Sequence, residues 1–213
     1  MFTGCSNYRG YGFNQPITLY NNVTNCAQMF NNCSYFNQPV NIPDSVINCH
    51  AMFSTCLLLN KPVTIGNSVT DCSSMFFQCR YFNQSIIIPD SVTNCSSIFY
   101  WCDKMSGDIT FGNNVINMSY AVFANNRSTI NIYINNTSSD VNVSGLLHSN
   151  YPHGYDNTAY IFCNNIEILN KSTTGSIIGN NDPITWEEVT NGYYNSQYNV
   201  YIYNNYSAET GRL

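Results

Sequence analysis

The sequence predicts a mainly β fold, in which a solenoid of 23-residue coils is followed by a β-rich C-terminal module. Three observations support this prediction: several columns of residues recur at a constant step of 23, apolar residues within each repeat alternate as in a strand, and the period is short. Helical-hairpin repeats need roughly 33 to 47 residues, whereas a leucine-rich repeat, with one strand and a return arc, needs roughly 20 to 29.

The constant step is clearest in the residues that we expect to form the interior. One coil cannot bury its own apolar face, so stacked coils must bury one another's. The expected core residues are the cysteine series Cys26, Cys49, Cys72 and Cys95, a second series Cys33, Cys56, Cys79 and Cys102, and the pairs Met29 and Phe30, Met52 and Phe53, and Met75 and Phe76.

Each repeat contains one short strand. In "FNQPVNIPDSV", Val40 and Ile42 are two residues apart, so they point to one face of the strand and Asn41 to the other. Pro43 lacks the backbone donor that a strand needs and ends it. The following "NCHAMF" is expected to curl back as a short helical or extended turn that buries Cys49.

The regular step predicts two domains. We expect a solenoid of about five coils over residues 1–127, with the first coil incomplete, because the register fades after "FANN". Residues 128–213 alternate differently, in "TINIYIN", "YIFCNNIEIL" and "NVYIYNNY", and are expected to form a β-rich capping or interaction module. The chain opens in mid-repeat, which predicts an apolar coil end that faces an upstream part, a partner or another subunit.

The ten cysteines are expected to be buried free thiols that pack as small apolar groups, because nearly all of them fall in columns of equivalent positions. Disulfides along a column stay geometrically possible. The column that includes Cys5 has five members, so one of them would need an outside partner such as Cys163. Zinc is disfavoured, because the pairs are spaced C-x6-C and not C-x2-4-C.

Composition excludes some functions. Charged residues make up 9% of the chain, the net charge is −5 and there is no basic stripe, which excludes a nucleic-acid-binding surface. The 35 asparagines favour turns over helix interiors. No apolar run is long enough to span a bilayer, and "MFTGCSNYRG" lacks the basic start and apolar stretch of a signal peptide.

Catalytic chemistry has little support, so we expect no enzyme, no cofactor and no metal. His148 and His153 could form a loop site with Asp156 or Asp140, but metal sites need three or more converging ligands. The adjacent Glu187 and Glu188 would point to opposite sides of a strand. Phosphate-loop, dinucleotide-binding and nucleophile-elbow motifs are missing from the sequence.

The repeat motif C-x2-F-x2-P-V-x-I-P-x-S-V-x2-C-x2-M-F-x2-C resembles the BspA-like leucine-rich repeats of bacterial surface proteins. Its "MF-x5-FNQPV" part is similar to the repeat of mycoplasma lipoproteins. The resemblance covers residues 1–127, although BspA-like repeats usually have one residue fewer before the strand and one more after it. It implies a solenoid for adhesion or recognition. The later "ITWEEVTNGYYNSQYNVYIY" resembles tails of structural proteins of gut phages.

We therefore expect a recognition or adhesion module of a phage tail or fibre, or of a bacterial surface, that binds a host glycan or protein. The expected contact surface is the outward column of the strands and the amide column beside it, where polar side chains suit sugars or a peptide edge; the residues are Thr18, Asn41, Thr64, Ile87, Thr110, Gln38, Lys61 and Gln84. The amides could instead only hold the coils together. The alternative function is a structural virion or surface-layer component that assembles with other proteins or with copies of itself.

Overall fold

The computed structural model describes residues 12–123, 129–137, 140–148, 158–164, 187–189, 192–195 and 200–204. These residues form strands and turns and contain no helix, as the mainly β prediction requires, and thus no helix that could cross a membrane. The strands are β1 Val40–Asn41, β2 Val63–Thr64, β3 Ile86–Ile88, β4 Ile109–Phe111, β5 Val122–Phe123, β6 Ile130–Ile134, β7 Leu147–His148, β8 Ala159–Cys163, β9 Glu187–Val189, β10 Gly192–Asn195 and β11 Val200–Asn204.

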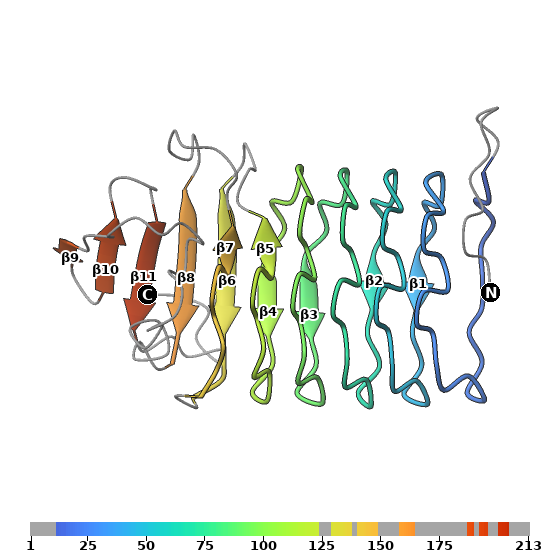
Figure 1. The fold of residues 1–213 in the computed structure, drawn as a ribbon, viewed down its shortest axis with the longest axis horizontal. Helices are drawn as coiled ribbons and strands as arrows, with labels where there is room; N and C mark the ends of the chain where they lie inside the picture. The colour runs from blue at the N-terminus through green and yellow to red at the C-terminus, as the bar shows by residue number, and fades with distance from the viewer. Residues whose placement is uncertain are drawn as a thin grey trace.

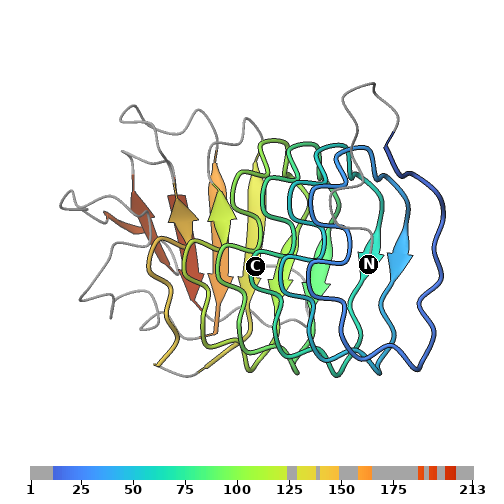
Figure 2. The same cartoon turned by 45° about the vertical axis from the view of Figure 1, so that its right-hand side comes forward.

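Successive 23-residue segments lie side by side with their strands parallel (Figure 1). Val40 pairs with Val63, and Ile86 with Ile109, so each pairing joins equivalent residues of neighbouring repeats. We call the 23-residue segments between residues 12 and 123 the stacked units. The backbone takes nearly the same path in successive units, as a second view shows (Figure 2).

A return arc brings the chain back from one strand to the next through consecutive tight turns rather than a helix. Met52 N–H donates to the Cys49 carbonyl within the unit at 3.1 Å, whereas Phe53 N–H donates to the Met75 carbonyl of the next unit at 2.9 Å. Two columns of non-glycine residues in the arcs have positive φ, among them Ala51 at 50°. The alternation of local and inter-unit bonds satisfies the backbone without regular secondary structure.

Asparagine side chains stabilise the start of each return arc. The Asn48 Oδ1 accepts the N–H of His50 at 2.8 Å, and Asp71 does the same for Ser73. This local bond to the residue two positions on is an Asx turn. The column explains part of the asparagine content, and it continues to Asn142, which forms a bridge with Asn117.

The interior holds the thiols, the methionines and a ladder of phenylalanines. Both cysteine series and the residues Phe30, Met52, Phe53, Met75 and Phe76 are at most 1% exposed, while Met29 is only partly buried. The rings of Phe30, Phe53, Phe76 and Phe99 stack at centroid distances between 5.4 and 5.7 Å. Equivalent side chains therefore contact each other along the whole series of stacked units.

The stack does not end where the sequence register fades. The strand order of the large sheet is β3-β4-β6-β8-β11-β10-β9, so it crosses residue 127 without interruption. Ile109 still pairs with Ile132 at the regular step, but Val122 pairs with Leu147 and Tyr133 with Phe162, so the later steps are longer than the repeat. The division into domains at residue 127 stays a prediction.

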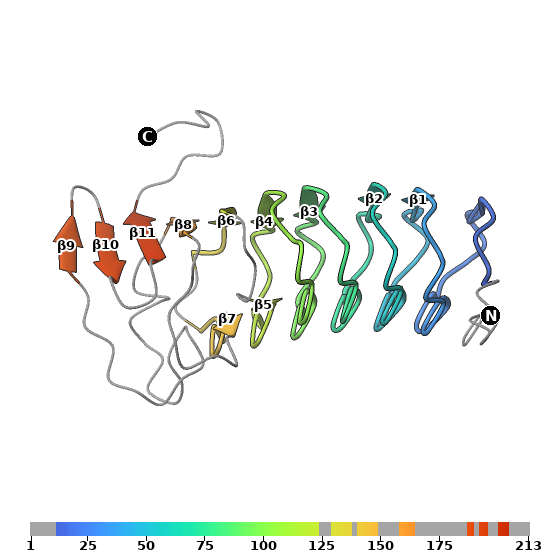
Figure 3. The same ribbon diagram turned by 90° about the horizontal axis from the view of Figure 1, so that it is seen from above.

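The strands occupy two sides of the stack. Seen from above, β3, β4 and β6 lie on one side, while β5 and β7 lie on the other, within the return arcs (Figure 3). All pairings are parallel up to β11, after which β10 and β9 pair antiparallel. The side formed by β1 to β4, β6, β8 and β11 carries the candidate site.

Candidate functional site

The outward side chains of the strands form one column that runs along the stack. In β3, Ile86 and Ile88 are buried and Ile87 between them is 71% exposed. The register joins Ile87 to Thr110 and Thr110 to Tyr133. We call the outward side of these strands the strand face. Its column comprises Thr18, Asn41, Thr64, Ile87, Thr110, Tyr133, Phe162 and Tyr203.

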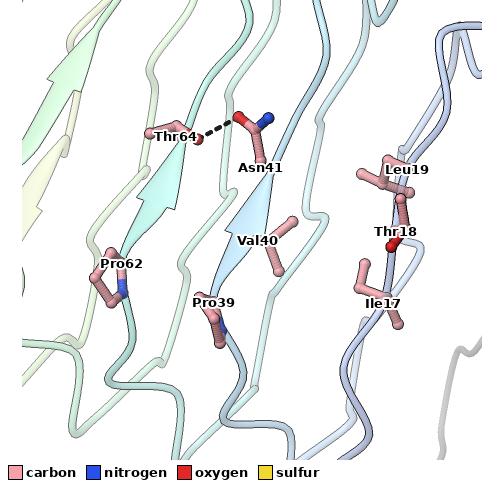
Figure 4. A pocket seen from close by; sticks show the side chains of 8 residues that line it. All are labelled: Ile17, Thr18, Leu19, Pro39, Val40, Asn41, Pro62 and Thr64. Carbon is pink, nitrogen blue, oxygen red and sulfur yellow. Dashed lines mark hydrogen bonds between the residues drawn. The ribbon is translucent and has the colours of Figure 1, made fainter.

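A groove of about 380 Å³ opens at the first units of the strand face. Figure 4 shows Thr18, Asn41 and Thr64, three of the expected contact residues, around it. The Thr64 hydroxyl donates to Asn41 Oδ1 at 2.6 Å. Apolar walls and a few polar groups are the usual lining of a small-ligand site; the remaining lining residues are Ile17, Leu19, Pro39, Val40 and Pro62.

The expected amide column serves the stack itself. Asn37 N–H donates to Asn14 Oδ1 at 2.8 Å, and the same bond joins each later unit to the one before. The Gln38 and Gln84 side-chain amides donate to Asn14 and Asn60 of the preceding units, at 3.0 Å. Lys61 is exposed in the glutamine position. These bonds join neighbouring units, and a ligand contact by Gln38, Lys61 and Gln84 stays a prediction.

The later strands carry aromatic side chains on the same face. The ring of Tyr133 on β6 stacks on that of Phe162 on β8 at 5.0 Å, and Phe162 stacks on Tyr203 of β11 at 5.5 Å. A second row joins Tyr160 to Tyr201 at 5.2 Å and Tyr201 to Tyr194 of β10 at 4.4 Å. We call the two sets the aromatic rows; all six side chains are half-buried.

The second row ends at carboxylates. Asn131 lies beside Tyr160 in the register and donates to the Asp108 carboxylate at 2.9 Å. At the other end Glu187 on β9 pairs with Tyr194. Burial, and then the neighbouring Tyr201 and Glu187, raise the pKa of the Tyr194 phenol. The Tyr194 phenol therefore remains a protonated donor at neutral pH.

The aromatic rows were not among the residues that sequence reasoning selected. The signal was present, because Tyr133 alternates with isoleucines in "TINIYIN", and Tyr201 and Tyr203 alternate with Val200 and Ile202 in "NVYIYN". The alternation correctly predicts strands. Their alignment, however, depends on the steps from β6 to β8 and from β8 to β11, which differ from the repeat and which no pattern in the sequence fixes.

The thiols are part of the packed interior. The nine cysteines that the structure describes are free and buried. The Sγ of Cys56 donates to the Phe30 carbonyl at 3.1 Å, and Cys79 and Cys102 repeat this bond one and two units on. Burial raises the pKa of the Cys26 thiol to about 11 and that of Cys72 well above its ordinary value. A protonated buried thiol is a poor nucleophile.

The described ranges bring no metal-binding cluster of histidine, cysteine or carboxylate groups together. His153 and Asp156 lie outside the described residues, and for His148 only the backbone in β7 is described. His50 Nδ1 lies 2.8 Å from Ser73 Oγ of the next unit, so that imidazole is part of the inter-unit contacts. Glu187 and Glu188 are both exposed on β9.

Comparison with known proteins assigns the chain to one protein family. Neither a curated protein nor a solved structure matches the chain. Residues 1–64 and 43–137 match one protein family, and the two matches together cover more than half of the sequence. The chain belongs to this family, which is described as Mycoplasma protein of unknown function, DUF285.

Proposed function

We propose that this protein is a non-enzymatic recognition module, that its fold is a leucine-rich-repeat solenoid, and that its strand face contacts a ligand on a host surface. The proposed setting is a phage tail or fibre or a bacterial surface. Membership of a Mycoplasma repeat family is compatible with a surface protein of this kind.

One observation carries the proposal. The strand-face column varies from Thr64 through Ile87 to Tyr133, whereas the neighbouring asparagine column that joins the units repeats nearly the same residue. A column that only holds coils together has no need to vary. A flat face with changing side chains and a groove at one end can select a ligand.

A pair of exposed isoleucines tests the proposal. Ile87 lies on the strand face at 71% exposure, whereas Ile116 is 53% exposed between β4 and β5, where its N–H donates to the Thr93 carbonyl of the preceding unit. Labelled wild-type protein is applied to a panel of bacterial cells that includes mycoplasma cells. We expect Ile87→Lys to weaken cell binding at least about tenfold, since a charge enters the contact, and Ile116→Lys to leave it unchanged. Equal binding by both variants would overturn the assignment of the strand face.

A structural role in a virion or surface layer is the second candidate. Leu58 and Tyr81 are exposed at 41% and 53% and occupy equivalent positions of adjacent units, outside the strands β2 and β3 that follow them. An apolar stripe of this kind suits a contact with another subunit. Sedimentation separates the candidates: a monomer that binds cells supports recognition, whereas obligate assembly without cell binding supports the structural role.

A further inference from the structure

We propose that the aromatic rows bind a linear, uncharged polysaccharide chain. This inference rests on the proposed recognition function and specifies its ligand. The site lies on β6, β8, β11 and β10, beyond the residues that the sequence pattern selected, and its chemistry differs from that of the groove near Thr18.

The shape of the site is that of a track. Each aromatic row crosses three adjacent strands, so its rings follow one another at the strand spacing. The rows also touch one another, since the ring centroids of Tyr160 and Tyr203 lie 6.4 Å apart and those of Tyr201 and Tyr203 lie 6.2 Å apart. A surface that repeats along one direction fits a ligand that repeats along one direction, such as a polymer chain.

The groups on the track match the chemistry of sugars. Within a row each ring packs its face against its neighbour, with interplanar angles of 14° for Tyr133 and Phe162 and 19° for Phe162 and Tyr203. A ligand above the row therefore meets ring edges and phenolic oxygens. Five of the six rings are tyrosines, which both donate and accept hydrogen bonds. A sugar unit presents hydroxyls and C–H groups together, and it can use both kinds of contact.

Charge argues against the other polymers. Asp108 and Glu187 stand at the two ends of the second row, and no described residue of the face between them carries a positive charge. A nucleic acid or an acidic glycan would be repelled, since both need basic groups. A cationic peptide would need to approach ring faces for cation–π contact, and the stacking within the rows occupies those faces.

The test uses affinity electrophoresis of the whole chain in gels that contain dextran, mannan, galactan or a soluble β-glucan, with alginate and poly-lysine as charged probes. We expect retardation by at least one neutral polysaccharide. The variant Tyr160→Phe/Tyr201→Phe/Tyr203→Phe keeps the rings and removes three hydroxyls, and its affinity should fall at least about tenfold. Tyr81→Phe, at an exposed tyrosine outside the strands and the aromatic rows, should bind like wild type.

The outcomes separate this inference from the proposed function. Retardation by no neutral polysaccharide, by poly-lysine alone, or equally in the triple variant and wild type overturns the inference. If wild type still binds cells and Ile87→Lys still abolishes that binding, the recognition function survives this failure with a different ligand. A Phe162→Leu variant, which removes the central ring, gives a second readout and should also weaken polysaccharide binding.

Discussion

The protein contains two kinds of aromatic ladder: one lies in the interior of the stacked units, and the other lies on the strand face of the later strands. The inner ladder runs through Phe30, Phe53 and Phe76, whose side chains are fully buried. The outer rows run through Tyr133 and Tyr160, which are half-exposed. Both arise from stacking: the inner ladder joins return arcs of neighbouring units, and the outer rows join neighbouring strands.

The difference between the ladders teaches which part of the stack is free to change. The inner ladder repeats phenylalanine at a step of 23, because one position must fill the same space in every unit. The outer column changes from Thr110 to Tyr133 within one step, because outward side chains have no interior to fill. Stability therefore depends on the inner ladder, and recognition is expected to depend on the outer one.

The largest expected effect is the loss of unfolding free energy at alkaline pH, which comes from the thiols of the interior. Burial raises the pKa of seven thiols of the stacked units above the ordinary 9.0; they are Cys26, Cys49, Cys56, Cys72, Cys79, Cys95 and Cys102. A raised folded pKa gives stability that is complete below pH 9 and is lost as pH rises. Between pH 9 and its raised folded pKa, each thiol should lower the free energy of unfolding by about 1.4 kcal/mol per pH unit.

Urea unfolding in the presence of a reductant at pH 7.5, 9 and 10 measures this loss, which should reach about 10 kcal/mol at pH 10 for the seven thiols. Tyr194 and Tyr203 also have pKa values raised above the ordinary 10.0, so they lose less stability than the thiols between pH 9 and 10. A Cys72→Ala/Cys95→Ala variant should lose less stability between pH 9 and 10. A free energy of unfolding that is constant from pH 7.5 to 10 would contradict the burial of the thiols.

Truncation of one ring in each ladder tests the comparison directly. Phe76→Ala removes a fully buried ring between Phe53 and Phe99, and should cost about 3–5 kcal/mol of unfolding free energy. Phe162→Ala removes a half-buried ring of the outer row, and should cost about 1 kcal/mol. Urea denaturation of both variants measures the difference. Equal losses would mean that the outer rows stabilise the fold as much as the core does.

Much of the stack could be predicted, because its columns repeat the same residues. The step of 23 correctly predicted mainly β units and the alternation of Val40 and Asn41. The tight turns of the return arc were harder to predict, because Gln28, Ala51 and Ser97 adopt positive φ without being glycine. Only the stacking of neighbouring units holds such residues in a conformation that is unfavourable for them.

The site was predictable only where the step is regular. Thr18, Asn41 and Thr64 were selected as one column, and they do line one groove. Tyr133 and Phe162 were placed in predicted strands, but their pairing depends on an irregular step that is longer than the repeat. A continuation of the stack was hidden for the same reason, since Asn117 forms its bridge with Asn142, at a longer step than the one that joins Asn94 to Asn117.

The smallest expected effect concerns the positive-φ positions, where the later part of the chain has already adopted the favourable residue. Gly145, with φ of 62°, comes three residues after Asn142, as Tyr120 comes three residues after Asn117. Ser97 has the same conformation, with φ of 56°. Glycine adopts it without steric cost, so Ser97→Gly should raise the unfolding free energy by about 0.5 kcal/mol.

The adjacent Ser96 is the matched control, because it is not among the positive-φ residues. Ser96→Gly only adds freedom to the unfolded chain, and should lower the unfolding free energy by about 0.5–1 kcal/mol. Gly145→Ala should cost about 1 kcal/mol for the reverse reason. Opposite signs at two neighbouring serines, measured by urea denaturation, would show that stacking imposes the backbone conformation. Losses of the same size at both would mean that the return arc carries no strain at Ser97, and that the glycine at 145 has another cause.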